Sequence, residues 1–401
     1  MTILDILLVV VSALVLVPIS VFVAECFAAL LPTRRREIRS TVSSRAAILV
    51  PAHNEEKCIA QTVAALAAQV RPADRIVVIA DNCTDATADQ ARSAGATVVE
   101  RFDEQRRGKG YALDRGVRYL EADPPEVVIV VDADCMLAPG SVDVLARTAA
   151  ATGRPAQAVN LINPPQAASA KARISALAFL VKNLVRPIGL MRLGLPCMIT
   201  GTGFCMPWQV IREAPLASGN IVEDMQMGLN LTMQGLLPLY CPEARVTSDL
   251  PSTESASVSQ RTRWEHGHLQ TLLTQAPRLV GKAVSTGRVR LLGVALDLSV
   301  PPLSLLVMLW GATSALTCLA WALGASPLPA VLMLAGGVGL LSAVIAGWAR
   351  FGRQICPFNT LLAVPMYVVW KLPVYLAFLL RRQKAWVRTE REAETIGQVR
   401  S

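Results

Sequence analysis

The chain has 401 residues, of which 53% are hydrophobic and 17% charged, and it carries a formal net charge of +9. Its mean hydropathy of +0.43 is high for a soluble protein of this size and predicts membrane segments. The basic residues cluster beside the apolar runs, as they do on the cytoplasmic flanks of membrane proteins, which argues against nucleic-acid binding as the source of the charge.

Residues 6–31 form one long apolar run with few polar interruptions. About 20 apolar residues are enough to cross a bilayer, so we predict an N-terminal transmembrane anchor within residues 1–33. A cleaved signal peptide is the alternative, but no basic residue precedes the run, which is also long for such a signal. The arginines at 34–36 predict a cytoplasmic position for the next domain, residues 40–256.

Short apolar strands alternate with helices through residues 45–250. The predicted strands are Ala46–Pro51, Arg75–Ala80, Ala96–Glu100 and Glu126–Val131, and the predicted helices between them are Gln61–Val70, Thr84–Gly95 and Tyr111–Leu120. Continuous apolar strands between helices indicate a parallel sheet that is covered on both faces. Ligands bind such sheets at the carboxyl ends of the strands, where Asn54, Asp81 and Asp132 stand.

Asp81 follows the second strand and begins the segment Asp81–Asp85. A carboxylate at this place can accept a hydrogen bond from a uracil N–H or a ribose hydroxyl. Helix capping is the alternative explanation of the segment, with Thr84 as the N-cap and Asp85 as an acid in the first turn. The two interpretations are compatible.

Two glycine-rich turns precede and follow the last predicted strand. Gly108 and Gly110 flank Lys109 at the start of a helix, where a lysine suits a phosphate or a carboxylate, although the spacing is not that of a P-loop. The second turn, Thr200–Gly203, lies between apolar stretches and by itself indicates only a loop.

Asp132 and Asp134 stand directly after the strand at 126–131. Two carboxylates with one residue between them can converge at the sheet edge and hold Mg²⁺ or Mn²⁺. Such an ion would bind a diphosphate and neutralise the charge that develops on a leaving nucleoside diphosphate. A solvated acidic turn is the alternative, because the D-x-D pattern recurs by chance.

Glu223 and Asp224 precede a predicted helix, Met225–Gln234. A carboxylate at this place stabilises the helix dipole. The alternative is a general base that takes the proton of an acceptor hydroxyl as the hydroxyl attacks an anomeric carbon.

Residues 257–290 are basic and amphipathic, which predicts helices on the membrane surface or against the domain. Gln260 and Arg263 share a helix face, and an arginine fork suits a diphosphate. Trp264 offers a flat surface to a sugar ring. An interfacial tryptophan beside arginines that reach the bilayer surface is the alternative.

The remaining residues, 291–401, are predicted to hold membrane segments and a basic tail. Pro302–Leu323 and Pro329–Ala349 are each about long enough to span a bilayer. Pro357–Leu380 is interrupted by Lys371 and two prolines. A span at this place would put the basic tail outside, so we predict a re-entrant or interfacial segment.

The ordered set of motifs resembles membrane-bound family-2 glycosyltransferases, the group that includes cellulose, chitin and hyaluronan synthases and ceramide glucosyltransferases. The resemblance covers roughly residues 45–270 and rests on Pro51-Ala52-His53-Asn54-Glu55, Asp81, Gly108-Lys109-Gly110, Asp132-Ala133-Asp134, Glu223-Asp224 and Gln260-x-x-Arg263-Trp264. It implies an α/β fold, namely a GT-A type nucleotide-sugar-binding domain flanked by transmembrane helices.

The resemblance also implies roles for these residues, with Asp224 as the catalytic base. The threonine that precedes this acidic pair in the family is Val222 here, which we expect to change packing rather than chemistry. The implied donor-binding residues are Asn54, Glu55, Asp81, Lys109, Asp132, Gln260 and Arg263; the acceptor-binding residues are Gly201, Thr202, Gly203 and Trp264; and the metal ligands are Asp132 and Asp134.

The implied activity is that of a metal-dependent, inverting hexosyltransferase with Mg²⁺ or Mn²⁺ as cofactor. It would move a sugar from a UDP-sugar to a growing exopolysaccharide or a lipid-linked saccharide at the cytoplasmic face of a membrane. The predicted orientation and the high alanine, arginine and leucine content favour a multi-pass protein of a bacterial inner membrane, with its catalytic domain in the cytoplasm. A single addition to a glycolipid, as in the ceramide glucosyltransferases, stays open.

The expected partners are the UDP-sugar, the saccharide or lipid-linked acceptor and membrane lipid, with no nucleic acid. A homo-oligomer and an assembly with other proteins of the pathway both stay open. A membrane sensor or transporter of nucleotide sugars is disfavoured because the apolar segments show no pattern of buried charges. An oxidoreductase is disfavoured because no G-x-G-x-x-G follows the first strand.

Overall fold

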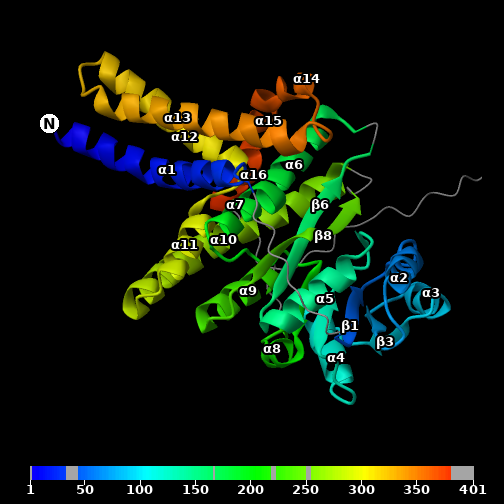
Figure 1. The fold of residues 1–401 in the computed structure, drawn as a ribbon. Coiled ribbons are helices and arrows are strands. Elements are labelled where there is room, and N and C mark those ends of the chain that lie inside the picture. Colours follow the sequence, from blue (N-terminus) through cyan, green and yellow to red (C-terminus); the bar gives the residue numbers. More distant parts are fainter. Residues whose placement is uncertain (1, 33–43, 166–167, 218–222, 250–253, 381–401) are drawn as a thin grey trace, which may run out of the picture.

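The described part of the chain combines a sheet covered by helices with a group of long apolar helices beside it (Figure 1). The computed structural model describes residues 2–32, 44–165, 168–217, 223–249 and 254–380. The arginine cluster at 34–36, Val222 and the basic tail lie outside these residues.

The described strands form one sheet in the order β3-β2-β1-β4-β7-β6-β8-β5. Their bounds are β1 Ala46–Ala52, β2 Arg75–Asp81, β3 Thr97–Arg101, β4 Val127–Val130, β5 Cys135–Leu137, β6 Ala156–Asn163, β7 Phe204–Pro207 and β8 Leu239–Asp249. Strands β3, β2, β1 and β4 are parallel, as predicted from their alternation with helices.

The sheet as a whole is mixed, because the strands after residue 131 do not continue the parallel pattern of the first four. Strand β7 is antiparallel to both β4 and β6, and β5 is antiparallel to β8. Strand β5 begins at Cys135, five residues after β4 ends at Val130. These two strands are not neighbours in the sheet, and β5 pairs instead with β8 at the sheet edge.

Alternate residues of each strand enter two separate cores, as the pleat of a strand dictates. Ile48 and Val50 pack on one face of the sheet, whereas Ala47 and Leu49 pack on the other, and all are fully buried. The first face carries α2 (Ile59–Ala67), α3 (Thr87–Ser93) and α5 (Ser141–Thr152), and the second carries α4 (Lys109–Leu120), α8 (Trp208–Glu213) and α9 (Glu223–Gln234). Two covered faces leave the ends of the strands as the accessible edge of the sheet.

Three apolar helices run side by side away from the sheet, namely α1 (Ile3–Ala28), α12 (Leu303–Ala322) and α13 (Leu328–Gly347) (Figure 1). Each belongs to a segment that is long and apolar enough to cross a membrane. The backbone N–H of Ser326, between α12 and α13, donates to Asp5 near the start of α1 at 2.8 Å. The start of α1 and the α12–α13 turn therefore lie at the same end of the group.

A fourth segment, Ala170–Arg192, is also long and apolar enough to cross a membrane, although 67% of its most apolar window is buried inside the protein. It connects β6 to β7, which are hydrogen-bonded neighbours in one sheet. A single crossing would place these two strands on opposite sides of the bilayer. The segment therefore packs along the domain and does not span; sequence analysis did not identify it.

The segment predicted to be basic and amphipathic folds into α10 (Glu254–Thr286) and α11 (Val289–Ser299), which pack against α9. The interrupted apolar stretch that follows α13 forms three short helices, α14 (Phe358–Leu361), α15 (Val364–Trp370) and α16 (Leu372–Leu380). Its re-entrant or interfacial position stays a prediction.

Candidate active site

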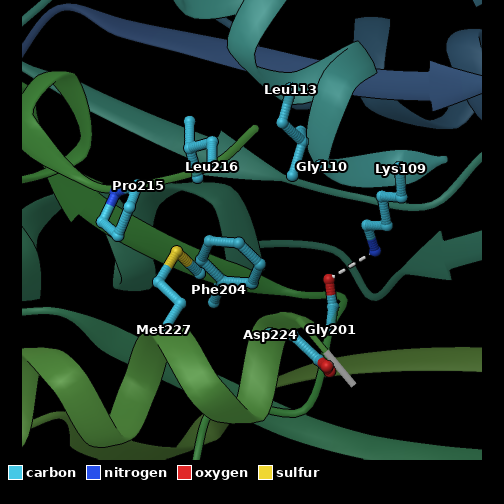
Figure 2. A pocket seen from close by; sticks show the side chains of 9 residues that line it. All are labelled: Lys109, Gly110, Leu113, Gly201, Phe204, Pro215, Leu216, Asp224 and Met227. Carbon is cyan, nitrogen blue, oxygen red and sulfur yellow. Dashed lines mark hydrogen bonds between the residues drawn. The ribbon is translucent and has the colours of Figure 1, made fainter. Parts of the chain in front are cut away.

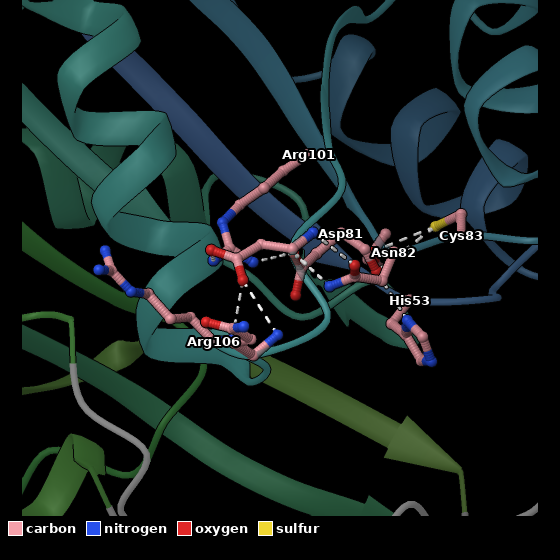
Figure 3. Close-up of polar contacts among 9 residues, drawn as sticks. His53, Asp81, Asn82, Cys83, Arg101 and Arg106 are labelled. Atoms are coloured by element: carbon pink, nitrogen blue, oxygen red, sulfur yellow. Dashed lines mark hydrogen bonds and ion pairs between the residues drawn. The ribbon is translucent and has the colours of Figure 1, made fainter.

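The carboxyl ends of β1 and β2 carry a connected polar cluster (Figure 3). Asn54 and Asn82 have φ angles of 55° and 52°, a left-handed conformation that asparagine tolerates better than most residues. Nδ1 of His53 lies 2.6 Å from the carbonyl oxygen of Asp81, and the N–H of Asp103 donates to Oδ1 of Asn82 at 2.8 Å. The first contact joins the ends of β1 and β2, and the second joins the end of β2 to the segment that follows β3.

Asp81, the predicted nucleoside-binding acid, is paired with an arginine that sequence analysis missed. Nη1 of Arg101 lies 2.6 Å from Oδ1 of Asp81, and both side chains are largely buried. Arg101 ends β3 in direct register with Asp81, and a basic residue at the end of the neighbouring strand is the signal that could have found it. The role of Asp81 toward a donor stays a prediction.

The side chain of Asn54 is used to position the loop after β2. Its Oδ1 accepts from the backbone N–H of Thr84 at 2.8 Å, and the N–H of Glu55 donates to Oγ1 of Thr87 at 2.7 Å. The prediction that Thr84 is the N-cap is wrong. Helix α3 begins at Thr87, whose N–H donates to Oδ1 of Asp85 at 3.0 Å, so Asp85 satisfies the helix start.

Asp132 and Asp134 lie together just beyond the end of β4, as predicted. One ligand atom each from Asp132, Asp134 and Cys135 lie within 4.8 Å of one another. Burial raises the pKa of the Cys135 thiol well above its usual range, and a soft sulfur is a poor ligand for Mg²⁺ or Mn²⁺. The two carboxylates offer hard oxygen ligands, so these residues fit either ion.

Lys109 connects the acidic pair to the glycine loop. Lys109 is the first residue of α4, and its Nζ is paired with Oδ1 of Asp132. The same Nζ donates to the carbonyl oxygen of Gly201 at 2.7 Å (Figure 2). Burial raises the pKa of Asp132, Lys109 opposes this change, and the charges of Asp134 and Asp224 add to it. The carboxylates and the lysine therefore act on one another electrostatically.

The glycine loop closely approaches Asp224, in the first turn of α9 (Figure 2). Gly201 has a φ of 86°, and a Cβ at this place would lie 2.7 Å from Oδ2 of Asp224. The left-handed conformation favours glycine, and a side chain at this place would displace the carboxylate of Asp224. The pocket between Lys109, Gly201 and Asp224 is otherwise lined by Gly110, Leu113, Phe204, Pro215, Leu216 and Met227.

A buried glutamine that sequence analysis missed holds the same loop. Nε2 of Gln157, in β6, donates to the carbonyl oxygen of Thr202 at 2.9 Å, and its Oε1 accepts from the N–H of Thr200 at 3.0 Å. Oγ1 of Thr202 in turn accepts from the N–H of Asp132 at 3.0 Å. A polar residue inside an apolar strand was the available signal. Gln157 and Thr202 thereby connect the loop to the acidic pair.

The predicted signature Gln260, Arg263 and Trp264 lies on α10, and these residues are not among those that line the pocket of Figure 2. The ring of Trp264 lies 5.6 Å from that of Phe179 on the buried segment between β6 and β7. The structure thus brings Lys109, Asp132, Gly201 and Asp224 together. It places the signature helix against the segment Ala170–Arg192.

Residues 44–267, more than half of the chain, match the family described as "Glycosyltransferase like family 2". The chain therefore belongs to the family-2 glycosyltransferases, which transfer sugars from nucleotide sugars. Its GT-A fold, predicted from the motifs, is confirmed.

Among solved structures, the fold is similar to mannosyltransferase PcManGT of Pyrobaculum calidifontis in complex with GDP-Man and Mn²⁺. The TM-score is 0.60 and the sequence identity 16%, with 95% of this chain and 100% of that chain covered. Such low identity shows the fold alone. A curated relative, 4,4'-diaponeurosporenoate glycosyltransferase of Staphylococcus aureus (strain USA300), is 39% identical over 90 residues, or 22% of this chain and 23% of the relative. The match thus spans less than a quarter of that relative.

Proposed function

We propose that this protein is an inverting hexosyltransferase that moves a sugar from a UDP-sugar to a growing exopolysaccharide or a lipid-linked saccharide, at the cytoplasmic face of a membrane. The observation that carries the proposal is the convergence of Asp132, Lys109, Gly201 and Asp224 beyond the end of β4. Separate elements supply an acidic pair for the donor and a further carboxylate for the acceptor. This is the arrangement that a single displacement at an anomeric carbon requires.

On the donor side, Asp132 and Asp134 would hold Mg²⁺ or Mn²⁺, which when bound supplies positive charge for the diphosphate. Lys109 lies at the start of α4, where the helix dipole and the ammonium both favour a phosphate. The polar cluster after β1 and β2, with Asn54, Glu55 and Asp81, is proposed to bind the nucleoside. Gln260 and Arg263 are proposed to bind the diphosphate.

On the acceptor side, Asp224 would take the proton of the acceptor hydroxyl. The freed oxygen forms a bond to the anomeric carbon, and the bond from that carbon to the diphosphate oxygen breaks with its electron pair. One attack from the face opposite the leaving group inverts the configuration. The turn with Gly201, Thr202 and Gly203 lies beside Asp224, and it is proposed to position the acceptor together with Trp264.

The Asp134→Ala variant is expected to bind nucleotide sugar with little enhancement by Mn²⁺. Removal of even an indirect metal partner weakens metal binding about 10- to 100-fold, so loss of a ligand should lower the Mn²⁺-dependent donor affinity by at least about tenfold. Titration calorimetry with and without Mn²⁺ measures this. Asp143→Ala, at an exposed side chain on α5, is the control. The same Mn²⁺ dependence in both variants would remove Asp134 from the metal site.

The alternative is a single addition to a glycolipid, and two observations support it. Leu113, Phe204, Leu216 and Met227 give the pocket beside Asp224 an apolar lining. The S. aureus relative is named as a glycosyltransferase of 4,4'-diaponeurosporenoate rather than of a polysaccharide. Both versions use the same donor chemistry and the same base.

A donor screen tests the proposal on the full chain in nanodiscs. UDP-glucose, UDP-N-acetylglucosamine, UDP-galactose, UDP-glucuronate and GDP-mannose are supplied with or without Mn²⁺ or Mg²⁺, and membrane lipid extract serves as the acceptor. We expect metal-dependent release of UDP from one donor. The size of the radiolabelled product distinguishes a polymer from a glycolipid. Turnover of GDP-mannose alone would refute the assignment of a UDP-sugar as the donor. The whole proposal would be refuted if the protein neither consumed nor bound any of these donors.

A further inference from the structure

One lysine on the buried segment Ala170–Arg192 is not explained by the roles above. The segment consists of α6 (Ala170–Leu180), a π-helical turn η1 (Val181–Val185) and α7 (Arg186–Arg192). Single π-helical turns inside α-helices occur often at functional sites. In η1, Val181 and Asn183 are buried, but Lys182 between them is exposed. Its long side chain therefore reaches accessible space from an otherwise packed helix.

The neighbours of Lys182 place that space at the proposed catalytic centre. Phe179 precedes it by about one helical turn, which puts both side chains on similar sides of the helix, and the Phe179 ring contacts that of Trp264. The charge of Lys182 is also within electrostatic reach of Asp224 and Glu265. Lys182 therefore stands on a segment that packs against the signature helix α10, with the charge of the proposed base Asp224 within electrostatic reach.

Two of the acids whose charges reach Lys182, Glu265 and Asp297, have other partners. Glu265 is paired with Lys371 at 2.6 Å, and Asp297 with Arg186 at 2.6 Å. Within the described residues, Lys182 itself forms no ion pair. A cation that protein partly surrounds costs free energy unless an anion or water compensates it. Because the Lys182 side chain is exposed, its ammonium is accessible to an anionic group of a substrate.

We propose that Lys182 is a further substrate-binding residue, whose ammonium binds a phosphate or carboxylate group of a substrate beside Asp224 and Trp264. This inference rests on the proposed function of Asp224 and α10. The anion has two sources, the diphosphate of the donor or an acidic group on an amphiphilic acceptor. The donor source makes Lys182 part of leaving-group binding, and the acceptor source makes it a determinant of acceptor specificity.

Binding measurements on the full chain in phosphatidylcholine nanodiscs test both sources without relying on turnover. The donor arm titrates UDP and GDP. The acceptor arm titrates dodecyl phosphate and dodecanoate, with dodecanol as the uncharged control. The variants are Lys182→Gln, Lys182→Arg and, as a matched control, Lys282→Gln, which changes an exposed lysine farther along α10.

We expect Lys182→Gln to lower the binding affinity about 10- to 100-fold for either the nucleotides or the anionic amphiphiles. This is the loss typical of a hydrogen bond between charged groups. Lys182→Arg should retain most of that affinity, and Lys282→Gln all of it, whereas dodecanol binding should not change. Unchanged affinity for the nucleotides and for both anionic amphiphiles would overturn the inference. The donor screen tests the proposed function separately, so a parent protein without turnover would not be confused with a failure at Lys182.

Discussion

The Asp224→Asn variant is expected to transfer sugar about 10²- to 10⁴-fold more slowly than the parent protein, the range that general base catalysis contributes. The amide keeps the shape of the carboxylate but cannot take the proton of the acceptor hydroxyl. Because Asp224 contacts the glycine loop closely, an isosteric change is needed to leave Gly201 in place. Donor binding should persist, since Lys109 and the acidic pair are unchanged.

Single-turnover transfer at saturating donor measures the first effect, and titration calorimetry with the nucleotide sugar measures the second. Asp143→Asn is the matched control, because it makes the same substitution at an exposed residue on α5, which covers the opposite face of the sheet. A variant that transfers sugar at the parental rate would refute the role of Asp224 as the base. A variant that loses donor affinity and transfer in parallel would instead place Asp224 on the donor side.

The part of the sheet that carries the acidic pair could be predicted because each strand is a local pattern. The runs at residues 46–52, 76–80 and 127–131 are continuously apolar, and a polar residue follows each of them directly. Their carboxyl ends meet at one edge when the strands are parallel. The proximity of Asp81 and Asp132 to one sheet edge therefore followed from chain order and the physics of the βα unit.

The second half of the sheet could not be predicted in the same way, because its pairing depends on contacts distant in sequence. Strand β7 pairs with β4, although the buried segment Ala170–Arg192 lies between them in the sequence. That segment contains Lys182 and Arg186, so its sequence does not show the continuous apolar character of α1. Hydrophobicity alone did not reveal that this helical segment with internal charges packs against β6 and β8.

The candidate site, like the sheet, was predicted only in part. The motif order predicted Lys109, Asp132 and Asp224 as members of one site, and the structure brings them together. Two supporting residues were missed, namely Arg101, which is paired with Asp81, and Gln157, which holds the glycine loop. A side-chain hydrogen bond between distant residues leaves no periodic pattern in the sequence. The family resemblance supplied roles, whereas the supporting contacts required coordinates.

A buried triad of charges connects the first apolar helix to the rest of the protein. Arg186 on α7 lies 2.5 Å from Glu25 on α1 and 2.6 Å from Asp297 on α11. The side chains are 8%, 2% and 11% exposed, so water screens them little. Arg186 belongs to the same segment as Lys182, and α11 follows the signature helix α10 directly. The triad therefore fixes α1 relative to the elements around the proposed site.

The Arg186→Met variant is expected to lower the free energy of unfolding by about 3–5 kcal/mol, because it leaves two buried carboxylates without their cation. Adding Glu25→Gln and Asp297→Asn should restore most of this stability, since neutral groups of similar size do not repel one another. Denaturant unfolding in mixed micelles measures both effects. Arg212→Met is the control, because the exposed Arg212 forms only a weak surface ion pair with Glu213, at 3.6 Å. Such surface changes alter the free energy of unfolding by at most about 0.5 kcal/mol. A single variant as stable as this control would show that the triad contributes little to holding α1 in place.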